Sequence, residues 1–353
     1  MRGSGAGRQL PVDEAWVRGL PKAEVHLHLE GCLPSETVAA AARRHGVDLT
    51  RGPGLPVADL AALLDYLDFS CSMIDQDEEL SDAAYRIMVR ARDAGCGHVD
   101  VICNPPHWPQ WTGRLDRLVH ALDAGFAAAE QDGLGTAGLC LSIKRTQTAN
   151  EAIEMVEWIL GARPPRVVAL SIDGNEADGA SSHTGRFVEA FERARAGGLR
   201  RCAHAGESSG AQGVRDAVDR LGAERVDHGI RCAEDPALVS ELASRAIPLD
   251  VCPSSNVILG VVGSLDDHPV AHLHRSGVRV SLNTDDPLLY GIDLAGEYRR
   301  CAAQFGWGRR ELAEIARTSI EASFATPERR TALLTALDRY MEEDADTSRP
   351  SGA

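Results

Sequence analysis

Short apolar runs alternate with longer amphipathic stretches along most of the chain. Eight apolar runs are rich in Val, Ile, Leu and Cys, as expected for strands buried on both faces. They cover 23–29, 98–103, 136–143, 166–173, 199–205, 225–228, 247–252 and 278–283. Helical patterns lie between them, at about 79–94, 113–132, 149–161, 183–197, 212–221, 235–245 and 266–276. This alternation predicts a (β/α)₈ TIM-type barrel, with an open doubly wound sheet as the alternative.

Two regions add helices to this alternation. Residues 32–97 form a mostly helical insertion after the first strand, at a position where it can cap the barrel mouth. One of its helices is expected to begin at Ser35, whose hydroxyl can cap the first turn. The part from about 294 to 342 is helical without a strand. We therefore predict one domain over 10–343, with disordered tails at 1–9 and 344–353.

Composition narrows the possible partners. The chain has 353 residues and a net charge of −15, which disfavours nucleic acid and anionic membranes because both would repel it. Its nine cysteines are spread singly and suggest free thiols in a reducing compartment. Neither a membrane-spanning apolar run nor a signal-peptide pattern is present, so a cytoplasmic location is expected. Because Gly-rich phosphate loops are also lacking, no nucleotide cofactor is implied.

The residues best suited to chemistry fall at strand ends. The carboxyl ends of all strands in a barrel lie at one face, where active sites are built. His26 and His28 alternate along the first strand and therefore point to the same side. The full set that should converge on this face is His26, His28, His204, Glu207, His228, Asp285 and Asp286.

This set predicts a metal centre. Three imidazoles (His26, His28 and His204) and one of the two aspartates are a good ligand set for Zn²⁺ with a bound water. Zinc lowers the pKa of such a water from about 15.7 toward about 7. Glu207 lies one helical turn past His204 and can transfer protons, while His228 or the second aspartate can hold the water.

Taken singly, several of these residues have a structural interpretation. Glu207 can cap the following helix, and His228 can bond to backbone in a strand-end turn. Asp285-Asp286-Pro287 alone resembles a turn or a helix start. His107 follows the second strand on the same rim and is a candidate substrate contact. His98 is expected inside the barrel, and the remaining histidines on helix or loop surfaces: His45, His120, His183, His268, His272 and His274.

Together the motifs resemble the adenosine/adenine deaminase family of the amidohydrolase superfamily. In family order they are Pro21 to Gly31, His204-Ala205-Gly206-Glu207, Asp227-His228-Gly229, Cys252-Pro253 and Ser281 to Pro287, within about Leu20 to Phe324. The resemblance implies a TIM-type barrel, one zinc ion per chain and hydrolytic loss of ammonia from the 6-amino position of a purine.

The resemblance also assigns roles. It implies that the zinc ligands are His26, His28, His204 and Asp285. Glu207 corresponds to the residue that protonates purine N1, and His228 to the one that orients the attacking water. Asp286 corresponds to the carboxylate that bonds to the ring and the water. Gly174 stands where the family's glycine meets purine N3, although the family usually has Ala-Gly-Asp-Glu there and this chain has Asp173-Gly174-Asn175-Glu176.

The substrate is less closely defined. Adenosine-specific members commonly carry Asp where this chain has Glu30, and members acting on free adenine often have Glu. The leading expectation is an adenosine-like 6-aminopurine nucleoside. The alternatives are free adenine or a modified nucleoside such as aminodeoxyfutalosine.

Two other classes of protein were considered. A metal-dependent esterase or lactonase on the same barrel would use two metals and a bridging carboxylate or modified lysine, for which Lys144 is the nearest candidate. A binding module without activity would be expected to have lost Glu207 or a metal ligand, and the sequence keeps all of them.

Overall fold

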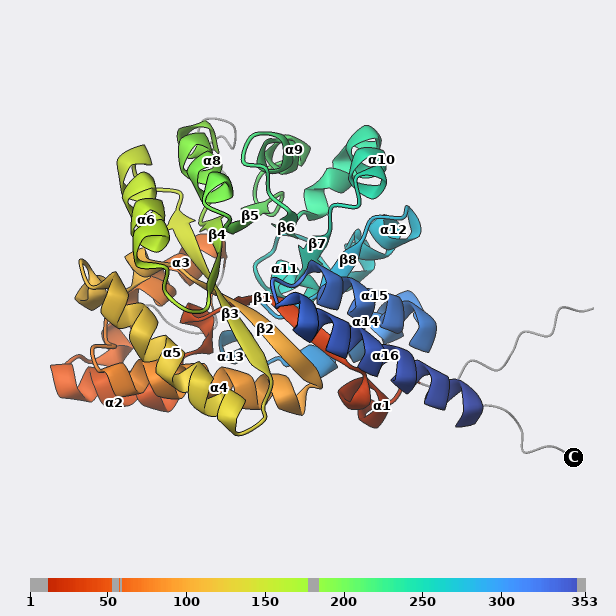
Figure 1. Ribbon diagram of the computed structural model, residues 1–353, viewed down its shortest axis with the longest axis horizontal. Helices are drawn as coiled ribbons and strands as arrows, with labels where there is room; N and C mark the ends of the chain where they lie inside the picture. The colour runs from red at the N-terminus through yellow and green to blue at the C-terminus, as the bar shows by residue number, and fades with distance from the viewer. Residues whose placement is uncertain (1–11, 53–56, 58, 177–183, 348–353) are drawn as a thin grey trace, which may run out of the picture.

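Eight parallel strands, hydrogen-bonded in sequence order, form a nearly closed barrel surrounded by helices (Figure 1). The computed structural model describes residues 12–52, 57, 59–176 and 184–347. The strands are β1 Lys22–His28, β2 Cys96–Cys103, β3 Thr136–Lys144, β4 Val167–Asp173, β5 Arg200–Ala205, β6 Arg225–His228, β7 Leu249–Val251 and β8 Val280–Leu282. The predicted TIM-type barrel is confirmed. The doubly wound alternative is wrong, because the strand order never reverses.

The barrel closes through residues of the predicted site. Leu27 on β1 forms a parallel bridge with Asp285, which follows β8. The backbone N–H of His28 donates to the carbonyl of Asp285 at 2.9 Å, and the N–H of Asp285 donates to the carbonyl of His26 at 3.2 Å. Closure therefore fixes the relative positions of side chains that lie far apart in the sequence.

Further helices follow each strand from β2 to β8, and the last three of them come after β8. They are α5 Leu115–Gln131, α6 Ala149–Ala162, α8 Val188–Ala196, α9 Ala211–Asp219, α10 Pro236–Ser244, α11 Pro253–Ile258, α12 Val270–Arg275, α13 Pro287–Tyr290, α14 Leu294–Phe305 and α15 Arg309–Ala322. The last of these packs against both β1 and β8 and so covers the closure.

The insertion after β1 is helical, as predicted. It contains η1 Glu30–Cys32, α2 Ser35–His45, η2 Leu49–Arg51, α3 Leu60–Cys71 and α4 Asp77–Asp93. Helix α2 begins at Ser35, as predicted, but Pro34 occupies the N-cap position, so the expected cap by the Ser35 hydroxyl is wrong.

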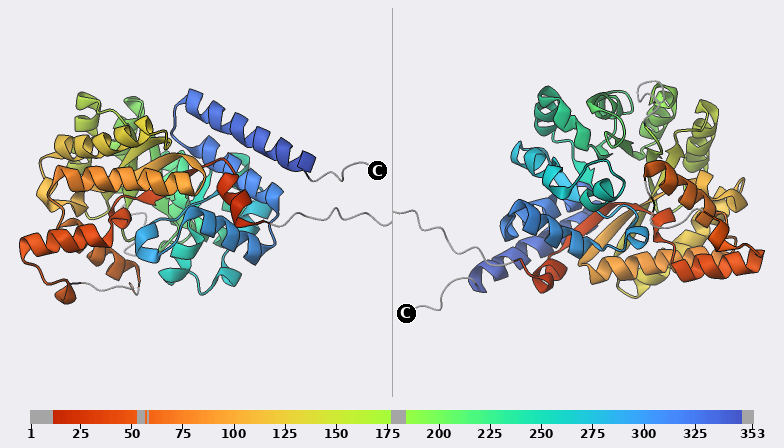
Figure 2. Two further views of the ribbon diagram at one scale, coloured as in Figure 1. Left: turned by 90° about the horizontal axis from the view of Figure 1, so that it is seen from below. Right: turned by 180° about the vertical axis from the view of Figure 1, so that it is seen from behind.

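The two ends of the described chain lie side by side, as the views in Figures 1 and 2 agree. The first helix, α1 Glu14–Gly19, meets the last, α16 Pro327–Thr347, where the Tyr340 hydroxyl donates to the carbonyl of Trp16 at 2.8 Å. Because α16 continues to Thr347, the part of the expected tail from 344 to 347 is helical, and the rest of that tail lies outside the described residues. The tail expected at 1–9 lies outside the described residues.

A buried ion cluster fills the barrel below the site. Arg225 on β6 lies 2.6 Å from Asp100 on β2 and 2.9 Å from Asp250 on β7, and its guanidinium stacks over the Phe324 ring. These groups are buried and link strands on opposite sides of the barrel. All nine cysteines are free and buried. Within the described ranges, no helix is long and apolar enough to cross a membrane.

Candidate metal centre and active site

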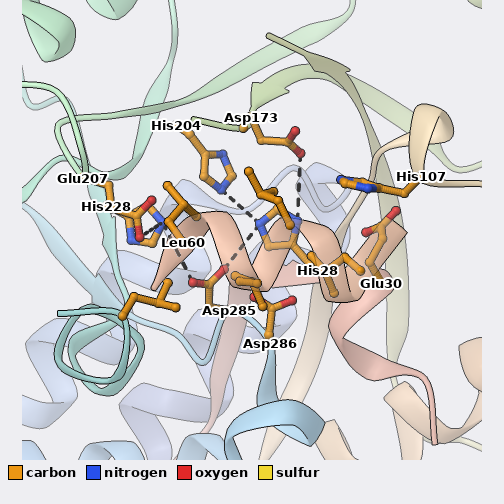
Figure 3. A pocket seen from close by; sticks show the side chains of 15 residues that line it. His28, Glu30, Leu60, His107, Asp173, His204, Glu207, His228, Asp285 and Asp286 are labelled. Atoms are coloured by element: carbon orange, nitrogen blue, oxygen red, sulfur yellow. Dashed lines mark hydrogen bonds and ion pairs between the residues drawn. The ribbon is translucent and has the colours of Figure 1, made fainter. Parts of the chain in front are cut away.

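Four of the predicted ligands converge at the carboxyl ends of β1, β5 and β8. One donor atom each from His26, His28, His204 and Asp285 lies within 4.8 Å of the others, and all four residues are buried. His28 Nε2 is 3.0 Å from His204 Nε2 and 3.4 Å from Asp285 Oδ1, as Figure 3 shows. His26 Nε2 approaches the same carboxylate oxygen at 3.3 Å.

The surrounding groups aim these imidazoles inward. His26 Nδ1 is 3.0 Å from the carbonyl of Asp250, which can only accept, so Nδ1 carries the proton and Nε2 keeps its lone pair. His204 Nδ1 faces Asp227 at 3.3 Å in the same way. His26 Nε2 is buried and has no hydrogen-bond partner among the described residues. Because a buried lone pair needs a partner, these residues fit a divalent metal ion.

The backbone is strained at two of the site residues. His228 and Asp285 have φ values of 62° and 64°, which residues other than glycine rarely adopt. Such conformations cost roughly 1–3 kcal/mol each and persist only where their surroundings impose them. Asp285 is held by the barrel closure and by the Ser255 hydroxyl, which donates to its Oδ2 at 2.6 Å.

Glu207 lies in the loop between β5 and α9. The helix begins at Ala211 with Gly210 at its N-cap, so Glu207 does not cap it. The Glu176 carboxylate holds this loop by accepting from the backbone N–H groups of Gly206 at 2.9 Å and Glu207 at 3.1 Å. Burial, followed by the charges of Asp285 and Glu176, raises the pKa of Glu207 well above its usual value. These surroundings therefore favour the protonated form of Glu207.

Asp286 lies beside Asp285 and faces the cavity. Burial, with the nearby charges of Asp285 and Glu30, raises the pKa of Asp286 well above its usual value. Its Oδ1 has no hydrogen-bond partner within the described ranges. A Cβ atom on Gly31 would lie only 1.9 Å from that oxygen, so the close approach of η1 depends on glycine.

A polar wall forms the other side of the cavity (Figure 3). Glu30 Oε1 accepts from the Trp108 indole at 2.7 Å and from the Asn104 backbone N–H at 2.8 Å. The Asn104 side-chain amide donates to Asp173 Oδ1. The second oxygens, Glu30 Oε2 and Asp173 Oδ2, are buried and lack a hydrogen-bond partner in the described part of the chain. We call Glu30, Asn104, Trp108 and Asp173 the acidic wall.

Helix α3 covers the cavity with a stripe of leucines at helical spacing. Leu60, Leu63, Leu64 and Leu67 all line it. The next turn carries Asp68, whose carboxylate lies 2.9 Å from Lys144 Nζ and 2.6 Å from His107 Nδ1. Lys144 thus ties the helix to the rim. It is committed to this ion pair and does not lie among the metal ligands, contrary to what the esterase alternative requires.

Most of the predicted site residues line one cavity. They are His28, Glu30, His107, Gly174, His204, Glu207, His228, Asp285 and Asp286. His26 lies buried beneath them. Gly174 has a φ of 94°, which favours glycine there. The leucine stripe was visible in the sequence as a helical period, but nothing local marked which surface it covers.

One prediction for a histidine was wrong. His268 was expected on the surface but is buried against Asn256. His98 lies inside the barrel, as expected, with its Nε2 2.9 Å from Asp100.

Known proteins resemble this chain over nearly its whole length. The family model described as Adenosine deaminase matches residues 21–340. An adenine deaminase from Rhodopseudomonas palustris (strain BisB18) is 31% identical over 342 residues, covering 95% of this chain and 98% of that protein. One from Rhizobium leguminosarum bv. trifolii (strain WSM2304) is 33% identical over 321 residues, covering 90% and 99%.

Solved structures are also similar to this chain over nearly its whole length. The crystal structure of adenine deaminase from Arthrobacter aurescens is 29% identical with a TM-score of 0.84, covering 92% of this chain and 99% of that one. An amidohydrolase from Burkhoderia ambifaria with bound Zn is 26% identical with a TM-score of 0.87, covering 98% and 97%.

Proposed function

Because the chain belongs to the adenosine deaminase family, we propose that it hydrolyses free adenine to the 6-oxopurine and ammonia. The chain is a deaminase, a hydrolase that acts on C–N bonds. The sequence alone favoured an adenosine-like nucleoside. The relatives named adenine deaminase favour the alternative, free adenine.

The acidic wall is the observation that favours free adenine over a nucleoside as the substrate. By the family resemblance, Asp286 faces the purine ring and Gly174 faces N3, and a single ring carbon separates N3 from N9. N9 would then face Glu30 and Asp173, each of which keeps a buried oxygen without a hydrogen-bond partner among the described residues. Free adenine offers an N–H to such an oxygen. A nucleoside has a sugar carbon at N9 and offers none.

The wall is also firmly held, which limits the space for a sugar. Trp108 and Asn104 both donate to Glu30, and Asn104 also donates to Asp173. Making room for ribose would break hydrogen bonds to buried carboxylates, each worth roughly 1.5–3 kcal/mol. A site that satisfies buried polar groups with one substrate rejects an analogue that leaves them unpaired, by up to about 10⁴-fold.

We propose zinc as the metal, held by His26, His28, His204 and Asp285. The deaminases of this superfamily use a divalent metal ion, and three imidazoles with one carboxylate suit zinc. Such an ion, when bound, acts as a Lewis acid that makes water a better nucleophile at neutral pH.

The protein's own groups then carry the remaining steps. Glu207, whose raised pKa favours its protonated form, donates to N1 and makes C6 more electrophilic. His228 Nε2, 3.5 Å from Glu207 Oε1, is placed to orient the attacking water. Water adds at C6, and its two protons go to the 6-amino group and to Glu207, which is thereby restored. The C–N bond then breaks to release ammonia and leaves the oxygen on C6.

An ultraviolet assay of adenine, adenosine and deoxyadenosine with the zinc-loaded enzyme tests the proposal. We expect kcat/KM for adenine to exceed that for adenosine by at least about 10²-fold. Equal or faster turnover of adenosine would overturn the choice of substrate.

The proton-transfer role is tested by Glu207→Gln. This variant should keep its zinc and lose about 10²–10⁴-fold in kcat. Glu192→Gln, an exposed position on α8, is the matched control and should leave the rate unchanged. Full activity in Glu207→Gln would contradict the assigned role.

A further inference from the structure

His228 faces the reaction centre with only one of its two ring nitrogens. Its Nε2 is 3.5 Å from Glu207 Oε1 and 4.0 Å from Asp285 Oδ2. Its Nδ1 points away from the cavity and lies 3.2 Å from the side-chain amide nitrogen of Asn256. A neutral imidazole carries one N–H and one lone pair, and the partner of one nitrogen decides what the other offers.

Three buried groups behind His228 form a continuous hydrogen-bonded chain. Asn256 lies on α11, and its Oδ1 is 3.2 Å from His268 Nε2. His268 Nδ1 in turn accepts from the backbone N–H of Val270 at 3.1 Å. Val270 is the first residue of α12, so its N–H has no partner within the helix. Asn256 and His268 are both buried.

The backbone N–H of Val270, at the end of this series of hydrogen bonds, determines which nitrogen of each histidine ring carries the proton. An amide N–H can only donate, so His268 Nδ1 must hold its lone pair and Nε2 must carry the proton. Burial lowers the pKa of His268 to about 4, so the ring is neutral at neutral pH. His268 therefore donates to Asn256 Oδ1. The amide of Asn256 then turns its NH₂ toward His228 Nδ1, which must accept.

The opposite arrangement is not possible. If His228 Nδ1 carried a proton, Asn256 would have to present its oxygen there and its NH₂ to His268. Both nitrogens of His268 would then have to accept, and the ring would carry no proton at all. An imidazole without a proton is an anion, which a buried site with no cation at that ring does not support.

We propose that Asn256 and His268 are positioning residues that hold His228 in the Nε2–H tautomer, so that an N–H faces the reacting oxygen. The tautomer follows from the hydrogen-bonded chain alone. Its catalytic consequence rests on the proposed deamination. The N–H orients the attacking water by donating to a lone pair of its oxygen, and Nε2 keeps this proton until that oxygen has gained negative charge. Neither residue touches the cavity.

Nitrogen NMR of zinc-loaded protein labelled at histidine with ¹⁵N tests the tautomer directly. The His228 signals are assigned by their loss in His228→Gln. We expect Nδ1 of His228 to show the shift of an unprotonated nitrogen and Nε2 that of a protonated one. In Asn256→Asp the carboxylate accepts at Nδ1 and should move the proton there.

Kinetics of three variants test the consequence. Asn256→Asp and His268→Leu should lose about 10²–10⁴-fold in kcat for adenine, with KM changed by less than about threefold. His268→Gln keeps a donor for Asn256 and should recover most of the rate. His272→Gln, at an exposed histidine on helix α12, which follows His268, is the matched control and should behave like the wild type.

The outcomes separate this inference from the proposed function. A protonated Nδ1 in the wild-type spectrum would overturn the inference, even if every variant failed to fold. An unchanged His228 spectrum in Asn256→Asp would also overturn it. If the wild type shows the Nε2–H tautomer but does not act on adenine, the proposed substrate fails and the tautomer assignment stands.

Discussion

Gly31→Ala should disable the site through a single methyl group. A Cβ at Gly31 would lie 1.9 Å from Asp286 Oδ1 and 2.4 Å from Asp286 Cβ. Rotation about χ1 can remove the oxygen from this contact but cannot move Cβ. To reach 3.4 Å, where ordinary contact begins, Asp286 Cβ and its backbone must therefore shift by about 1 Å.

A displacement of this size is costly for catalysis. Misplacing a reacting group by about 1 Å can lower the rate by about 10²-fold, equivalent to about 2.7 kcal/mol of transition-state stabilisation. We expect kcat/KM for adenine to fall by about that factor. The overpacking should also lower the free energy of unfolding by roughly 1–3 kcal/mol.

The assay is steady-state deamination of adenine, with zinc content and circular dichroism measured on the same samples. Gly161→Ala on α6 is the matched control, because a Cβ there meets nothing within 4 Å among the described residues. It should keep full activity and gain up to about 1 kcal/mol in stability. If Gly31→Ala keeps its zinc and a rate within about threefold of the wild type, the reasoning about Asp286 is refuted.

Three further predictions concern the metal, the barrel interior and helix α3. Removing the metal with a chelator should lower the midpoint of thermal unfolding, and added Zn²⁺ should restore it. An ion bound only by the folded state stabilises that state by about 2.7 kcal/mol at 100 times its Kd. An unchanged midpoint would contradict a resident metal. Arg225→Met leaves Asp100 and Asp250 buried without their cation and should cost roughly 3–5 kcal/mol in urea unfolding, so a loss below about 1 kcal/mol would contradict the role of the cluster. Burial alone would raise the pKa of Asp68, but the hydrogen bonds and charges of His107 and Lys144 outweigh it and lower that pKa to about 2. The stabilisation from this ion pair is therefore present above a pH of about 4 and is lost as the pH falls toward 2. Asp68→Asn should raise KM for adenine more than it lowers kcat, and an unchanged KM would show that the tie to α3 does not matter.

The sequence determined the barrel and the composition of its site. Each of the eight predicted runs overlaps a strand, because strands buried on both faces are rich in apolar residues. His26 and His28 could be assigned to one face because a strand alternates its side chains. The helix ends were less secure: Pro34, not Ser35, is the N-cap of α2, and α16 runs on to Thr347. End positions depend on a few capping contacts, which a periodic pattern does not record.

Only the tertiary structure decided how the site residues are supported. The carbonyl of Asp250 orients His26, and the bridge between Leu27 and Asp285 closes the barrel at the site itself. The pair Asn256 and His268 left no local signal, since a single buried polar residue in a helix or loop looks like an exposed one in sequence. These contacts join residues that are distant in the chain, and they exist only once strand register and barrel closure bring them together. A strand pattern can predict which side chains reach the active face, but the partner behind each one is a property of the closed barrel.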